Sequence, residues 1–171
     1  MRPGAALLLA LTGASLGCRS KTAAQVLEPR QLLEGLSMSQ STRGAVDWSL
    51  KARSAVLRED AKLAELTEPR MEFLKNGKVV SRVSSLRGIV RTDTHDVVLS
   101  TGVVLDAIED RSVLKTETLD YSSKTRLFTT QADILVTRPD GVLRGRGLEA
   151  KPDLSEIRIF NQQSVIKGKP Q

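Results

Sequence analysis

Histidine, cysteine and carboxylate side chains most often carry enzyme chemistry, and this chain of 171 residues holds one His and one Cys. His95 lies in the polar segment Thr92–Asp96, whose composition is typical of a turn. A serine-hydrolase arrangement would need this imidazole in a pocket beside a nucleophile, and the sequence holds no nucleophile-elbow motif. We therefore interpret His95 as a surface residue of a turn.

Three glutamates are the remaining candidates for catalysis. Glu68, Glu72 and Glu117 have the carboxylates that a glycoside hydrolase uses as a pair. Sequence spacing does not determine whether two of them meet, and carboxylates on the solvent face of strands give the same pattern. A secreted hydrolase is thus an alternative, but the sequence favours a protein without enzymatic activity.

The other motifs indicate neither a metal nor a cofactor. Gly145-Arg146-Gly147 lacks the strand-to-helix setting of a phosphate loop, and its glycines suit bulges or close strand packing. A single cysteine, Cys18, excludes an intramolecular disulfide and a paired-cysteine metal site. We expect no metal and no cofactor.

The N-terminal segment has the pattern of an export signal. The seven apolar residues Ala5–Leu11 are far fewer than the roughly 20 that a membrane-spanning helix needs. Ala14–Cys18 resembles a lipoprotein lipobox, with Ser15 where leucine is usual, so Cys18 is a candidate for lipidation. Cleavage near Gly17 without lipidation, or an uncleaved anchor, are the alternatives.

These patterns divide the chain into three parts. We expect a signal peptide over residues 1–17, a tether over 18–33 and a folded domain over 34–168. The domain would lie in the periplasm, held at a membrane by lipidated Cys18 or an N-terminal anchor. We favour the inner membrane.

Composition narrows the possible partners. The net charge of +6 comes from basic residues that are scattered, which argues against nucleic-acid binding and permits an anionic lipid. Aromatic residues are only 3% of the chain, so Val, Leu, Ile and Ala must fill the interior.

Alternating apolar and polar residues indicate antiparallel strands from Leu36 onwards. Asn76-Gly77 predicts a two-residue hairpin turn. The segment Ala52–Leu66 contains helix-forming residues, but Arg58-Glu59-Asp60 is typical of a turn, so we predict two strand ends there.

Four stretches share one pattern, in which an apolar strand end is followed by a small or polar break and a second apolar run. They recur about every 30 residues, the period of stacked β units. Since no long helix intervenes, we predict an all-β fold, an open β-jellyroll or β-sandwich with an apolar groove. The stretches are Leu66–Phe73, Leu99–Leu105, Phe128–Leu135 and Ile159–Ile166.

We expect the apolar faces of these strands to line the groove. Trp48 fits a core position as well as a ligand platform, and the two roles merge if the core is an open groove. Adjacent apolar pairs leave the register open, because a one-residue slip exchanges the faces of a strand. The expected lining residues are Leu36, Met38, Val46, Trp48, Leu50, Met71, Phe73, Val83, Leu99, Leu114, Phe128 and Leu143.

The order and spacing of several blocks resemble the LptC family, the periplasmic component of the lipopolysaccharide export machine. LptA and the N-terminal domain of LptD share its repeats. The resemblance extends over about residues 33–168. Its blocks are Gly44–Ala52, Thr67–Phe73, Leu99–Val103, Leu114–Leu119 and Leu143–Leu148.

The resemblance implies a V-shaped jellyroll that holds the lipid A acyl chains of lipopolysaccharide and passes the molecule on. Family members pair head to tail by their edge strands. The N-terminal edge would meet the membrane subunits of the export ABC transporter, and the C-terminal edge an LptA-like protein. Gly44 and Gly145 fall where the family has glycines important for function.

Two functions therefore remain for comparison. The first is a lipopolysaccharide-binding relay between transporter and bridge protein, acting without catalysis. The second is a structural or assembly lipoprotein of the cell envelope that binds only proteins.

Overall fold

A computed structural model describes residues 30–165, and every regular element in this range is a β-strand, which confirms the all-β prediction. The expected signal peptide, Cys18 and residues 166–168 of the expected domain lie outside the described residues. The strands are β1 (Arg30–Thr42), β2 (Ala45–Arg58), β3 (Leu63–Thr67), β4 (Arg70–Lys75), β5 (Lys78–Ser84), β6 (Arg87–Arg91), β7 (Val97–Ala107), β8 (Ser112–Ser122), β9 (Leu127–Arg138), β10 (Gly141–Ala150) and β11 (Ile157–Val165).

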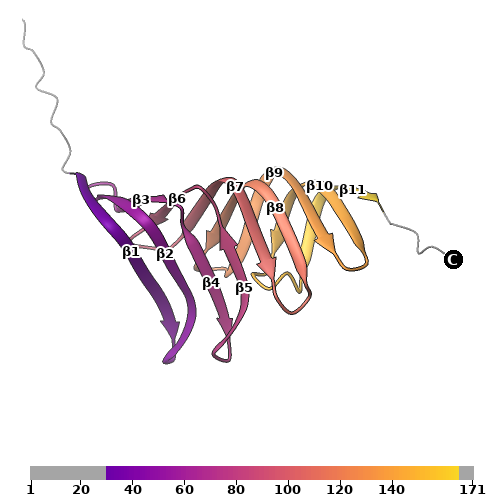
Figure 1. The fold of residues 1–171 in the computed structure, drawn as a ribbon, viewed down its shortest axis with the longest axis horizontal. Helices are drawn as coiled ribbons and strands as arrows, with labels where there is room; N and C mark the ends of the chain where they lie inside the picture. The colour runs from indigo at the N-terminus through magenta and orange to yellow at the C-terminus, as the bar shows by residue number, and fades with distance from the viewer. Residues whose placement is uncertain (1–29, 166–171) are drawn as a thin grey trace, which may run out of the picture.

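The eleven strands form one antiparallel sheet whose members follow one another along the long axis of the domain (Figure 1). Their order is β11-β10-β9-β8-β7-β5-β4-β2-β3-β6, with β1 on the other side of β2 and an additional pairing of β6 with β7. Within the described residues, β1 and β11 are therefore the two end strands.

The N-terminal half closes into a ring, because two long strands belong to both arms of the sheet. The first half of β2 pairs with β4 and its second half with β3. The first half of β7 pairs with β6 and its second half with β5. The β4–β5 hairpin and the β3–β6 pair thus form opposite walls of a trough, and their apolar faces bury each other.

In three of the four repeated stretches, the polar break coincides with an irregularity of the strands, whereas Asn161–Gln163 of the fourth pair regularly with β10. In the first stretch, Glu68 with a φ of 50° separates β3 from β4. In the second, the pairing of β7 with β8 shifts between Ser100 and Val103. In the third, Gln131 and Ala132 fall in the register shift between β9 and β10. Such irregularities bend strands, so these breaks mark the fold line of the trough.

Two tight hairpins show the turn chemistry that the sequence predicts. Asn76 and Gly77 have φ values of 53° and 75° between β4 and β5, as the mirror-image two-residue turn requires. Arg43 and Gly44 form the same kind of turn between β1 and β2, with φ values of 53° and 83°.

The strand boundaries confirm the prediction for residues 52–66 and place the start of the sheet earlier than expected. β2 ends at Arg58 and β3 begins at Leu63, so the segment from Ala52 to Leu66 does consist of two strand ends. β1 begins at Arg30, which places residues 30–33 of the expected tether in the sheet, where Leu33 packs against the core. Across residues 30–165 we find no helix with the length and hydropathy to span a membrane.

Candidate functional site

Most of the predicted groove residues lie together in one buried interior. They belong to a single apolar cluster that extends from β2 through β4, β5, β7 and β8 to β9. Each is at most 4% exposed, because alternation places it on the inner face of its strand. These residues are Trp48, Leu50, Met71, Phe73, Val83, Leu99, Leu114 and Phe128.

The two end hairpins are less completely covered. Leu36 and Met38 on β1 are partly buried and pack against the cluster, as does Leu143 on β10. The apolar interior therefore continues to both ends of the sheet, where fewer strands enclose it.

Val46 lies outside this interior, with 41% of its surface exposed. The pairing of β1 with β2 shifts between Gln40 and Ser41, so β2 carries an extra residue beside Val46. This bulge breaks the alternation by which the sequence placed Val46 on the same face as Trp48.

Four of the five aromatic side chains of the protein meet in the interior. The ring centroid of Tyr121 lies 4.9 Å from that of Phe73, 5.3 Å from that of Phe128 and 6.3 Å from that of Trp48. Edge-to-face pairs of this kind contribute about 0.5–1.5 kcal/mol beyond their buried area. Tyr121 is absent from the predicted lining, although its position two residues after Leu119 in an alternating strand was a usable signal.

Polar groups close the interior beside Trp48. Its indole N–H donates to Oε1 of Gln40 at 3.0 Å, and the Ser123 hydroxyl donates to the same oxygen at 2.6 Å. The Ser123 backbone N–H donates to Asp96 at 2.8 Å. These bonds tie β1 to the turn before β7 and the turn after β8. His95 lies in the first of these turns, as predicted, but it is half-buried, 6.5 Å from Trp48 between ring centroids.

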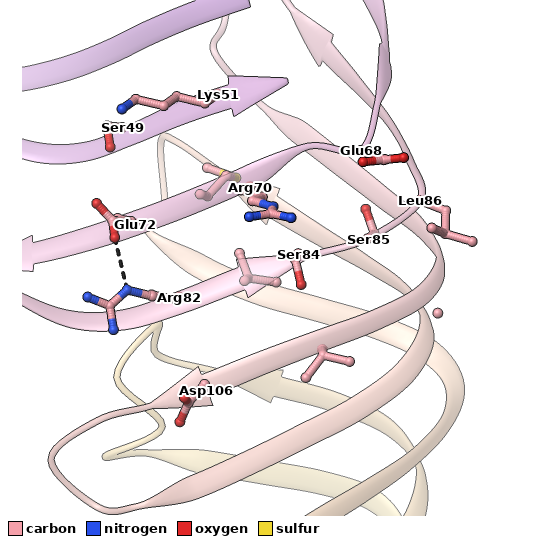
Figure 2. Close-up of a pocket in the computed structure, with 14 residues that line it drawn as sticks. Ser49, Lys51, Glu68, Arg70, Glu72, Arg82, Ser84, Ser85, Leu86 and Asp106 are labelled. Carbon is pink, nitrogen blue, oxygen red and sulfur yellow. Dashed lines mark hydrogen bonds and ion pairs between the residues drawn. The ribbon is translucent and has the colours of Figure 1, made fainter. Parts of the chain in front are cut away.

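Two of the three candidate glutamates are engaged in ion pairs on the outer face. Glu68 lies 2.7 Å from Arg53, and Glu72 accepts a hydrogen bond from Arg82 Nε at 2.9 Å (Figure 2). Glu117 lies on β8, in the register shift between β8 and β9. In the described range, no three His, Cys, Asp or Glu residues are grouped so that they could hold a metal ion.

The outer face of β2, β4, β5 and β7 is hollowed by a cavity of about 660 Å³ (Figure 2). Most of its side chains are polar or charged, among them Lys51, Arg70, Arg82, Glu72 and Asp106. The buried cluster of the interior is more completely apolar than this lining, so the interior is the better candidate for binding an apolar ligand.

The interior has an opening, which we call the mouth, near the turn of the β4–β5 hairpin and the start of β2. A hollow of about 410 Å³ reaches Phe73 and Tyr121, which belong to the aromatic cluster. Its rim carries three cationic side chains, each with a carboxylate partner. Arg126 lies 3.3 Å from Asp47, Lys75 lies 3.8 Å from Asp153, and Lys151 pairs with Glu156.

Ionisation states at the mouth follow from burial and from these charges. Burial raises the pKa of Tyr121 to about 12, although the nearby Arg126 acts in the opposite direction. Burial also acts to raise the pKa of Asp153, but hydrogen bonds from Ser155 and the charges of two lysines outweigh it and hold this pKa below its ordinary value. At neutral pH the mouth therefore has a neutral aromatic floor and a rim of ionised pairs.

The two glycines that the resemblance singles out are needed for different reasons. Gly44 has a φ of +83° and open space around the position of a Cβ. A Cβ at Gly145 would lie 2.5 Å from Cγ2 of Ile159 and 2.7 Å from the backbone oxygen of Asn161. Gly44 thus permits the turn, whereas Gly145 permits the close approach of β11 to β10.

Comparison with known families gives one match. Residues 5–165 match the family model described as "Lipopolysaccharide-assembly, LptC-related", which covers all eleven strands and nearly the whole chain. Among curated proteins, no sequence matches significantly.

Proposed function

The chain belongs to the LptC family of lipopolysaccharide-assembly proteins, and from this premise we propose that it is a relay that receives lipopolysaccharide from an ABC transporter of the inner membrane and passes it to an LptA-like protein. Family membership gives the protein a role in lipopolysaccharide transport in the cell envelope. The relay step, the partners at each edge and the residues that hold the lipid are our proposal.

The observation that carries this proposal is an apolar interior that continues into a mouth whose rim carries three cationic side chains in ion pairs. Acyl chains transferred from water to the interior gain about 0.8 kcal/mol per buried CH₂ group. Phosphate groups at the rim would compete with Asp47 and Asp153 for Arg126 and Lys75, forming hydrogen bonds between charged groups. An amphiphile such as lipopolysaccharide presents both kinds of group at once.

The end strands support the proposed partners. In the described sheet, β1 pairs only with β2, and β11 pairs only with β10. Each leaves one row of backbone groups available for β-strand addition. We assign the β1 edge to the transporter subunits and the β11 edge to the LptA-like protein. Attachment by Cys18 or by the apolar segment before it is part of the same proposal.

Photo-crosslinking tests the proposed lipid site. A benzoylphenylalanine in place of Phe128 keeps an aromatic ring on the inner face of β9, and the same substitution at the exposed Thr129 is the matched control on the outer face. We expect lipopolysaccharide adducts in cells at position 128 and none at position 129. A folded variant that gives no adduct at 128, or equal adducts at both positions, would contradict the proposal. Protein adducts alone at 128 would favour the structural lipoprotein.

A further inference from the structure

The six residues between β10 and β11 place one leucine in the core. Leu154 is 0% exposed and belongs to the apolar cluster, whereas Ser155 and Glu156 beside it are exposed. Residues 151–153 and Ser155 of this segment also form part of the rim of the mouth. We call this segment the 151–156 loop. It lies at the rim of the mouth and is anchored in the core by the Leu154 side chain.

The loop is held together mainly by its own bonds. The Lys151 N–H donates to the Glu156 carbonyl at 3.0 Å, and the Leu154 N–H donates to the Lys151 carbonyl at 2.9 Å. Asp153 accepts hydrogen bonds from the backbone and the hydroxyl of Ser155. Because these bonds are internal, they persist when the loop moves as a unit.

Few polar contacts hold the loop to the rest of the domain. An ion pair of 3.8 Å between Lys75 of β4 and Asp153 joins the loop to a strand outside its own hairpin. Because the Lys75 side chain is exposed and the pair is long, it contributes only roughly 0–1 kcal/mol. Leu154 also has a φ of 55°, a conformation that costs a residue with a side chain about 1–2 kcal/mol. Burial of the leucine side chain is therefore what keeps the loop closed.

Open space lies on both sides of the loop. The hollow of the mouth, about 410 Å³, is on one side, and a second hollow of about 190 Å³ lies between the loop and the ends of β9, β10 and β11. Leu127 and Lys151 line both hollows. An outward movement of the loop would join the two into one opening with Phe73 and Tyr121 at its floor.

We propose that the 151–156 loop is a lid over the entrance to the interior, and that Leu154 occupies an acyl-chain subsite that one chain of the bound lipid takes over. This inference rests on the proposed lipid-binding function and adds the place where the lipid enters the interior. The isobutyl group of Leu154 is the same kind of aliphatic surface as an acyl chain, so the exchange keeps the core filled. The same movement releases Lys75 from Asp153, which leaves a cation at the rim for a phosphate group.

The test measures how fast purified lipopolysaccharide enters the full-length protein. Trp48 is the only tryptophan and is buried in the aromatic cluster, so its fluorescence reports the arrival of a ligand in the interior. In a Cys18→Ser background, Lys75→Cys and Asp153→Cys are joined by a short bis-maleimide with a reducible linkage, which locks the lid. Reduction of the linkage then reopens the lid in the same sample.

We expect the locked protein to bind on the order of tenfold more slowly, with the rate restored by reduction. Leu154→Ala should bind several-fold faster than wild type. Leu32→Ala, the same change at a leucine on β1 that is 70% exposed, should match wild type. Equal rates for locked and reopened protein would overturn the lid while leaving the relay intact. A wild-type protein that gives neither a Trp48 response nor crosslinks at position 128 would overturn both.

Discussion

The two ends of the sheet are built from hairpins that differ in almost every respect. At the N-terminal end, a two-residue turn joins β1 to β2, and the strands pair from Arg30–Arg58 to Thr42–Ala45. At the C-terminal end, the six-residue lid joins β10 to a shorter last strand. The first hairpin adds Leu36 and Met38 to the interior, whereas the second adds a side chain from its loop, Leu154.

The glycines of the two hairpins show what this difference means. Gly44 acts through its backbone conformation, and the space around it is free. Gly145 acts through the absence of a side chain, because backbone and side-chain atoms of β11 occupy the place of a Cβ. A mutation at one end therefore disturbs a turn, and a mutation at the other separates two strands.

The largest effect is expected for Gly145→Val. Its side chain overlaps a backbone oxygen of β11, so the strand must move, at a cost of about 1–3 kcal/mol. Urea denaturation should show the loss, and amide exchange should accelerate in β11 more than in β1. Gly141→Ala is the control in the same strand, since its Cβ would meet nothing within 4 Å. If Gly145→Val and Gly141→Ala destabilised the protein equally, the close approach of β11 would not explain the need for glycine at position 145.

A smaller effect is expected for Gly44→Ala, about 1–2 kcal/mol, because alanine disfavours the left-handed conformation of the turn. Gly44→Asn should recover part of this loss, since asparagine tolerates that conformation better. The same urea titrations measure both. If asparagine were as costly as alanine at this site, the positive φ would not explain Gly44.

The smallest effect at neutral pH is expected for Tyr121→Phe, which removes a hydroxyl near the N-terminal side of the mouth. The raised pKa of about 12 means that the folded state resists ionisation. Its contribution to stability is thus complete below pH 10 and is lost as the pH rises from 10 to 12. The urea midpoint of wild type should fall over this range relative to that of Tyr121→Phe. If the urea midpoints of wild type and Tyr121→Phe changed in parallel with pH, the Tyr121 hydroxyl would not be shielded from water in the folded state.

The features that could be predicted from the sequence depend only on residues that are close together in the chain. The Asn76-Gly77 turn and the alternation around Leu99 need only neighbouring residues, so both are readable from the chain. The polar breaks of the repeats were visible for the same reason, because bending a strand requires local backbone irregularity.

The features that could not be predicted depend on contacts between strands that are distant in the sequence. Val46 was misplaced because its bulge depends on how β1 pairs with β2. Leu154 follows Lys151-Pro152-Asp153, a segment typical of an exposed turn, and is buried only because the loop folds back over strands distant in sequence. The charged rim combines Lys75 at the end of β4 with Arg126 and Lys151 from two connections, so no sequence window contains it.

The sharing of β2 and β7 between both walls also determines how the domain can deform. Around the ring β2-β4-β5-β7-β6-β3, spreading the walls would break backbone hydrogen bonds. From β8 to β11, each described strand pairs only with its sequence neighbours, and the walls meet along a line of irregular pairing. The two walls of the trough should therefore resist separation at its N-terminal end and separate more readily between β8 and β11.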